Sequence, residues 1–124
     1  MKINEGITNI IKNHLIENRP WGKFERFTLN EKSTVKIITL NPKKRLSLQL
    51  HKKRLEFWYF LDNPAKLTIG KKIFRAKMGD FVVVRKGFKH RVESFSKPVR
   101  FLEISFGKFD EEDIVRFEDD FGRK

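Results

Sequence analysis

The start of the chain shows the spacing of an amphipathic helix. Apolar residues recur every three or four positions, at Ile3, Ile7, Ile10, Ile11 and Leu15. This recurrence is typical of one helix face, so we predict a short helix over residues 3–16. The proline and glycine that follow in the sequence RPWG (residues 19–22) would end it.

Residues from about 22 to 106 have the pattern of a β protein. Short runs rich in valine, isoleucine, phenylalanine and threonine alternate with turn-forming sequences such as DNP (residues 62–64) and MGD (residues 78–80). The predicted strands cover residues 24–29, 34–40, 46–51, 56–61, 66–69, 72–75, 80–84, 90–93 and 100–106. Many short strands at this spacing are typical of a sandwich or barrel.

The end of the chain changes character again. Four acidic residues, 110–113, precede Ile114 and Val115, and carboxylates favour the positive end of a helix. Asp110 is a suitable N-cap, so we predict a terminal helix of about two turns. The predicted organisation is one domain, with an amphipathic helix over residues 1–18 and a barrel with its C-terminal helix over residues 19–124.

Composition narrows the class of protein. The 124 residues are enough for one domain with a real core, and they contain no cysteine, which excludes a disulfide scaffold and a thiolate metal site. We see no signal peptide and no membrane-spanning stretch, and we expect a cytoplasmic protein. The 28 basic and 16 acidic residues give a net charge of +12, which attracts anions but equally describes a lysine-rich surface without a dedicated partner.

The most informative polar residues lie near the middle of the chain. Gln49 and His51 are two apart on a predicted strand, so both point to the same face. Glu56 follows five residues later, and a turn through residues 52–54 would return it to the same interior. His90 opens a later predicted strand. Each residue alone is typical of an ordinary surface or core position, and only the combined spacing favours a common site.

Two imidazoles, a carboxylate and an amide oxygen form a reasonable set of metal ligands. This mixture of nitrogen and oxygen suits zinc, manganese, iron, cobalt or nickel better than calcium or magnesium. We therefore predict one divalent metal ion, with zinc as the first choice, held by Gln49, His51, Glu56 and His90.

Four segments resemble a known family, the C-terminal cupin domain of type II phosphomannose isomerases, which is often fused to mannose-1-phosphate guanylyltransferase. They are RPWG (19–22), LSLQLHKKRLEFW (46–58), KHR (89–91) and EEDIVRFEDDFGR (111–123). The resemblance implies an all-β cupin fold, a double-stranded β-helix or jelly-roll barrel, and the same four metal ligands. It also implies interconversion of mannose 6-phosphate and fructose 6-phosphate. The family's lysine and closing arginines, with roles in substrate binding or catalysis, fall on Lys36, Arg116 and Arg123.

An aldose–ketose isomerisation moves a proton between two carbons through an enediol. Lys36 is the first choice for the base and Glu103 the second. Arginines suit the grip on phosphate because the guanidinium fork matches that group. Arg54 and Arg91 are the predicted phosphate ligands, with Arg116 and Arg123 as further candidates.

Two other functions fit the same sequence. Two histidines and a carboxylate on a β-barrel also describe a non-haem iron oxygenase, although Gln49 would crowd the positions that dioxygen needs. A non-catalytic cupin would bind a sugar, or nucleic acid through basic clusters such as residues 43–45 and 52–54. For the main interpretation the partner is a small sugar phosphate, with no membrane and no nucleic acid, and we expect a homodimer.

Overall fold

The computed structural model describes residues 11–123, which form strands and no helix. The strands are β1 (Leu15–Arg19), β2 (Gly22–Arg26), β3 (Thr34–Leu40), β4 (Leu48–Leu50), β5 (Arg54–Phe60), β6 (Ala65–Ile69), β7 (Lys72–Ala76), β8 (Phe81–Val84), β9 (His90–Ser94), β10 (Val99–Gly107) and β11 (Val115–Glu118). The all-β prediction is confirmed.

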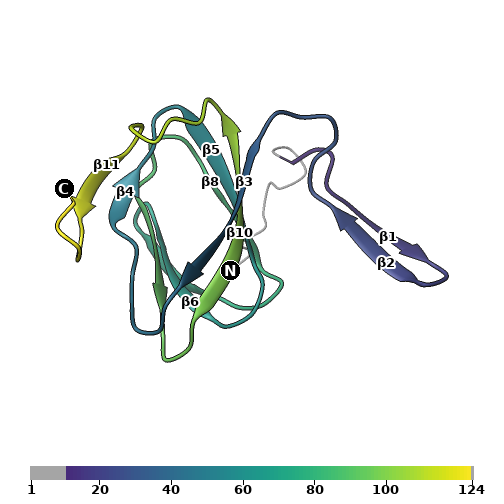
Figure 1. Ribbon diagram of the computed structural model, residues 1–124, viewed down its shortest axis with the longest axis horizontal. Helices are drawn as coiled ribbons and strands as arrows, with labels where there is room; N and C mark the ends of the chain where they lie inside the picture. Colours follow the sequence, from purple (N-terminus) through teal and green to yellow (C-terminus); the bar gives the residue numbers. More distant parts are fainter. Residues whose placement is uncertain (1–10, 124) are drawn as a thin grey trace.

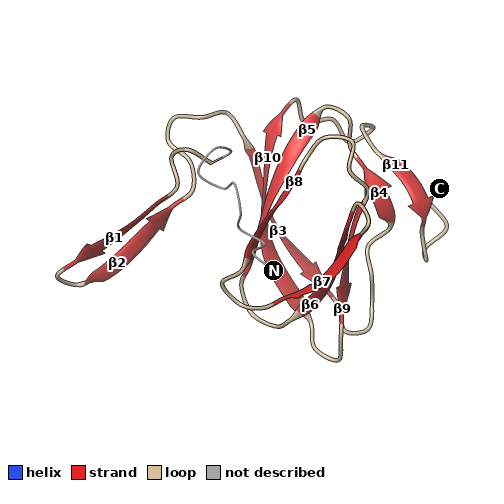
Figure 2. Cartoon of the chain, turned by 180° about the vertical axis from the view of Figure 1, so that it is seen from behind, coloured by secondary structure: helices blue, strands red, loops and turns tan. Residues whose placement is uncertain are grey.

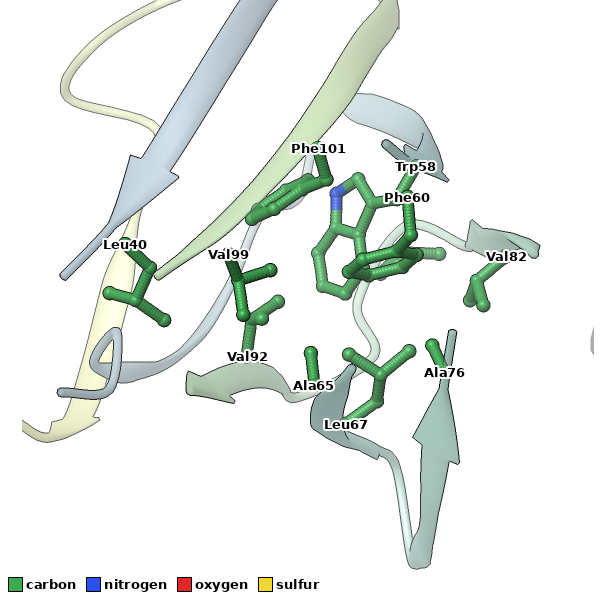
Figure 3. Packing of buried hydrophobic residues seen from close by; sticks show 11 residues of the cluster. Leu40, Trp58, Phe60, Ala65, Leu67, Ala76, Val82, Val92, Val99 and Phe101 are labelled. Atoms are coloured by element: carbon green, nitrogen blue, oxygen red, sulfur yellow. The ribbon is translucent and has the colours of Figure 1, made fainter. Parts of the chain in front are cut away.

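Two antiparallel sheets form the body of the molecule (Figure 1). One has the strand order β3-β10-β5-β8 and the other β11-β4-β9-β6-β7. Residues that alternate along each strand point into the space between the sheets, where Trp58, Phe60 and Phe101 pack against Leu67 and Val92 (Figure 3). Burial of these large side chains is the main source of stability, at roughly 1.5–3 kcal/mol for each.

Strand β5 shows the alternation that positions the site. Trp58 and Phe60 are buried between the sheets, whereas Phe57 belongs to a second apolar cluster on the outer face of the β3-β10-β5-β8 sheet. Ile11 and Phe27 cover part of that outer face. The predicted inward direction of Glu56, Trp58 and Phe60 is therefore confirmed.

A hairpin of β1 and β2 projects away from the barrel (Figures 1 and 2). The predicted N-terminal helix is wrong for the residues that can be checked, because residues 11–13 form a bend and turn and Leu15–Arg19 is a strand. The turn at Pro20 and Trp21, followed by Gly22 at a φ of 144°, reverses the chain so that β1 pairs with β2. Residues 1–10 of the prediction lie outside the described part.

The predicted C-terminal helix is also wrong. Residues 111 and 112 form a turn, and Val115–Glu118 is the strand β11, which pairs with the edge of β4. Asp110 does accept the backbone N–H of Glu112 at 3.0 Å, as a cap would, but the chain then extends. Instead of continuing as a helix, the chain is held at Asp113, whose carboxylate accepts the backbone N–H groups of Lys52 and Lys53. Among the described residues, none lies in a helix that is long and apolar enough to cross a membrane.

Candidate functional site

Two rows of side chains face each other across a cavity between the sheets. Gln49 lies opposite both Arg116 and His90, so β11, β4 and β9 form one wall. On the other sheet, Glu103 lies opposite both Lys36 and Trp58, so β3, β10 and β5 form the second wall. The cavity has a volume of about 190 Å³ and a largely polar lining.

His51, Glu56 and His90 meet at the inner end of this cavity. Their nearest ligand atoms all lie within 4.8 Å of one another. His51 Nε2 is 3.4 Å from Glu56 Oε2, and His90 Nε2 is 3.8 Å from Glu56 Oε1. All three side chains are at least 95 % buried. A bend at residues 52–53 returns Glu56 to the interior, as the sequence predicted.

Backbone carbonyls fix the orientation of both imidazoles. His51 Nδ1 lies 2.6 Å from the carbonyl oxygen of Asp113, and His90 Nδ1 lies 2.9 Å from that of Phe88. Each Nδ1 therefore donates a proton to a carbonyl, which leaves Nε2 as the possible ligand atom of each ring, close to the Glu56 carboxylate. In His51 this Nε2 accepts a hydrogen bond from Arg54, which a bound metal ion would replace. Burial lowers the pKa of His90 to about 4, so this ring is neutral at pH 7 and suited to bind a metal.

These residues fit a divalent metal ion. Two ligand atoms that each lie about 2.0–2.1 Å from a tetrahedral Zn²⁺ are about 3.4 Å apart, close to the 3.4 and 3.8 Å that separate the two Nε2 atoms from the Glu56 carboxylate. Gln49 lines the same cavity and donates its amide nitrogen weakly to the carbonyl of Ser47 at 3.5 Å, which leaves the amide oxygen as its ligand atom. The coarser prediction, a buried group able to hold a metal, is confirmed for His51, Glu56 and His90.

Arg54 and Trp58 hold the carboxylate of Glu56 in place. Arg54 Nε donates to Glu56 Oε2 at 2.9 Å, and Trp58 Nε1 donates to Glu56 Oε1 at 3.2 Å. Arg54 Nη2 also lies 3.1 Å from His51 Nε2, which accepts because a guanidinium can only donate. Arg54 therefore reaches the cavity beside the candidate metal ligands.

The second wall carries a carboxyl group with an unusual pKa. Burial, and then repulsion from Glu56, raise the pKa of Glu103 to about 7, although Lys36 and Arg54 act in the opposite direction. The Lys36 amine lies 4.3 Å from the centre of the Phe109 ring and 3.9 Å from Glu111. Lys36 is thus held toward the 109–111 loop.

The predicted arginines divide into two groups. Arg116 and Arg123 line the cavity, and Arg116 Nη1 donates to the carbonyl of Arg123 at 3.3 Å. The buried Arg116 Nε has no hydrogen-bond partner among residues 11–123. Arg91 lies outside the cavity, where its guanidinium binds the carbonyl of Leu46 and the carboxylate of Glu118, both at 2.9 Å. Arg91 thus fastens β9 to its neighbours, and the structure does not bring it to the site.

Asp113 is a buried residue that the sequence interpretation missed. Its carboxylate accepts the backbone N–H groups of Lys52 and Lys53, each at 2.9 Å. Although burial acts in the opposite direction, these two donors hold the pKa of Asp113 below its usual value. The residue is one of four adjacent acids, and nothing in the sequence distinguishes it from the others.

Comparison with known proteins gives one family and several relatives. Residues 7–119 match the family described as "Mannose-6-phosphate isomerase C-terminal". The xanthan biosynthesis protein XanB of Xanthomonas campestris pv. campestris is 35 % identical over 107 residues, which are 85 % of this chain and 23 % of that protein. The alginate biosynthesis protein AlgA of Pseudomonas aeruginosa is 33 % identical over 90 % of this chain and 24 % of its own length.

A further relative is the mannose-1-phosphate guanylyltransferase ManC of Salmonella typhimurium, 35 % identical over 85 % of this chain and 22 % of that protein. The chain thus spans about a quarter of the length of the curated relatives it matches.

Solved structures support the fold. A cupin protein from Bacteroides fragilis has a TM-score of 0.57 at 22 % identity, over 64 % of this chain and 70 % of that one. Oxalate decarboxylase from Bacillus subtilis has a TM-score of 0.64 at 22 % identity, over 70 % of this chain and 24 % of that one. At these identities the similarity establishes the cupin fold alone.

Proposed function

The chain belongs to the mannose-6-phosphate isomerase C-terminal family, and from this premise we propose that it is a metal-dependent isomerase of sugar phosphates. The substrate pair we propose is mannose 6-phosphate and fructose 6-phosphate. The observation that carries the proposal is the buried group of His51, Glu56 and His90, which shares one cavity with a carboxyl group of pKa about 7 and with three arginines.

Such a reaction needs charge stabilisation at the sugar oxygens and a group that carries a proton between the two carbons. A bound divalent ion supplies the first by polarising those oxygens. His51, Glu56 and His90 would hold it, with Gln49 as the fourth ligand. The neutral imidazole of His90, whose pKa is lowered to about 4, favours metal binding at neutral pH.

Glu103 is the residue we propose as the proton carrier. A base acts best when its pKa lies near the working pH, and burial brings the pKa of Glu103 to about 7. Lys36, the first choice from the sequence, is directed at Phe109 and Glu111, so we give it the role of attracting and orienting the anionic substrate.

The phosphate group requires cations in the cavity. Arg116 and Arg123 come from the C-terminal segment, and Arg54 comes from β5 and lies beside His51 and Glu56. Arg116 carries a buried N–H group without a partner among residues 11–123, and a phosphate oxygen would satisfy it. The net charge of +12 would raise the local concentration of a dianionic sugar phosphate.

A coupled assay for conversion of mannose 6-phosphate into fructose 6-phosphate tests the proposal. The protein is treated with chelator and then supplied separately with zinc, cobalt, manganese or nickel. We expect activity only after metal is added, and its loss in His51→Ala. Metal binding without turnover of any hexose 6-phosphate would reject the isomerase and leave the metal site in place.

A further inference from the structure

Residues 110–123, which we name the C-terminal clasp, lie over one side of the cavity. The clasp contributes Ile114, Arg116 and Arg123 to the cavity lining. Its strand β11 lies at the outer edge of the sheet beside β4, at the left of Figure 1, with a register shift between Arg116 and Glu118. An edge strand with few ladder bonds is a low-stability element that can open without unfolding of the barrel.

Asp113 is the point at which the clasp contacts the metal-ligand loop. Its carboxylate accepts the N–H groups of Lys52 and Lys53, and its main-chain oxygen accepts the Nδ1 proton of His51 at 2.6 Å. Asp113 is only 9 % exposed, so these bonds are sheltered from water. One residue therefore holds the clasp closed and fixes the proton on His51.

A second anchor lies on the surface. Arg45 Nε and Nη2 bind the two carboxylate oxygens of Asp120 at 2.8 and 2.9 Å. This bidentate pair holds the end of the clasp, close to Arg123 in the chain. Because it is exposed, it can be removed without disturbing the core.

We propose that Asp113 is a positioning residue that couples anion binding by the clasp to metal binding by His51, Glu56 and His90. An anion bound by the unpartnered Arg116 Nε favours the closed clasp, and the closed clasp fixes the ring of His51 through the bond from its Nδ1 to the Asp113 carbonyl. Metal and anion therefore bind cooperatively. The inference rests on the proposed function only in that the cavity takes a metal and an anionic group.

Coupling between two ligands is reciprocal: each ligand changes the affinity for the other by the same factor, typically about 5- to 150-fold. Inorganic phosphate should raise the affinity for Co²⁺ about tenfold, and Co²⁺ should raise the affinity for phosphate by the same factor. A phosphate that merely touches the metal, or feels its charge, would also produce coupling. The two explanations differ in whether the coupling passes through Asp113.

Asp113→Asn separates them, because it leaves the metal ligands and the arginines unchanged. The amide would present an NH₂ group to one of the two backbone N–H groups, so the clasp would lose part of its hold. We expect Co²⁺ affinity to fall about 10- to 100-fold, because the loosened clasp no longer holds the Asp113 carbonyl firmly against the Nδ1–H of His51. We also expect the effect of phosphate on Co²⁺ affinity to disappear.

Glu112→Gln is the matched control, since it converts an exposed acid of the same clasp to its amide. The experiment is isothermal titration of the chelator-treated full chain with Co²⁺, with and without inorganic phosphate. Wild type and Glu112→Gln should both show the tenfold coupling. Retention of the coupling in Asp113→Asn would overturn the proposal in favour of direct contact.

Asp120→Asn gives a second route to the answer if circular dichroism shows that Asp113→Asn is unfolded. It removes the Arg45 pair and should reduce the coupling at least threefold, and full coupling in this variant would overturn the proposal.

An absence of coupling in wild type would also overturn the proposal, even if the isomerase activity is present. Coupling without isomerase activity would support the clasp and reject the proposed reaction, and wild type that binds no Co²⁺ would defeat both.

Discussion

Glu103→Gln should stabilise the metal-free protein at alkaline pH and should abolish most of the activity of the metal-loaded protein. The side chain is 7 % exposed, and its pKa rises from 4.5 to about 7 on folding. Because the folded state keeps the proton to higher pH than the unfolded state does, this carboxyl group costs stability as the pH rises from 4.5 through 7. The amide replacement keeps the shape and removes that cost.

The size of the effect follows from the change in pKa. A difference of about 2.5 between the folded and unfolded values corresponds to about 3 kcal/mol, at ~1.36 kcal/mol for each tenfold change in proton affinity. Glu103→Gln should therefore match wild type at pH 4 and exceed it by up to about 3 kcal/mol at pH 8. Taking the difference between the two proteins cancels the titrating groups that do not interact with Glu103.

Urea unfolding at several pH values, in the presence of chelator, measures this difference. The activity of the metal-loaded variant should fall by ~10²–10⁴-fold, as expected for the loss of a general base. A stability difference that stays constant from pH 4 to pH 8 would refute the proposed burial of a proton on Glu103. Unchanged activity would instead refute its role as the proton carrier.

Four further outcomes are expected. Burial lowers the pKa of His90 to about 4, so as the pH falls this histidine is protonated in the unfolded state before it is protonated in the folded state. The metal-free Glu103→Gln variant should therefore lose about 3 kcal/mol of unfolding free energy between pH 6.5 and pH 4, measured by urea unfolding. An unfolding free energy that does not change over this range would contradict the prediction. Gly107→Ala should destabilise the folded protein by ~1–3 kcal/mol or more, since the φ of Gly107 is 102° and a Cβ there would lie 2.7 Å from the carbonyl oxygen of Lys53. An unchanged thermal unfolding temperature would contradict this. Arg116→Lys should raise KM for the sugar phosphate about tenfold, because a lysine loses the fork geometry, and an unaltered KM would remove Arg116 from the phosphate site. Light scattering should give twice the chain mass of 14.9 kDa, because within residues 11–123 the outer edge of β3 has no partner strand, and a clean monomer would exclude the expected homodimer.

The interior of the barrel was predictable because strands have a period of two. The alternation from Glu56 to Phe60 places the acid and two aromatic residues on one face, and the structure has them there. The spacing of Gln49 and His51 is informative for the same reason. The combined spacing predicted that His90, at the start of a later strand, belongs to the same group, and the family resemblance implied the same ligands.

The two ends of the chain were not predictable in this way. The spacing of Ile11 and Leu15 fits a helix face, but the turn after Arg19 brings β2 against β1, and that pairing decides the structure. At the other end, the partners of Asp113 are backbone N–H groups about sixty residues away. Local sequence patterns contain no information on such contacts, so the acidic run resembles a helix start.

Metal titration followed by turnover shows whether the bound ion is needed for the isomerisation. The chelator-treated chain is supplied with increasing amounts of Co²⁺ while conversion of mannose 6-phosphate is measured after each addition. We expect no activity without metal, a linear rise, and saturation at one ion per chain, with Glu56→Gln inactive throughout. Turnover that is already complete without metal, or a bound equivalent of Co²⁺ with no turnover at all, would contradict this expectation.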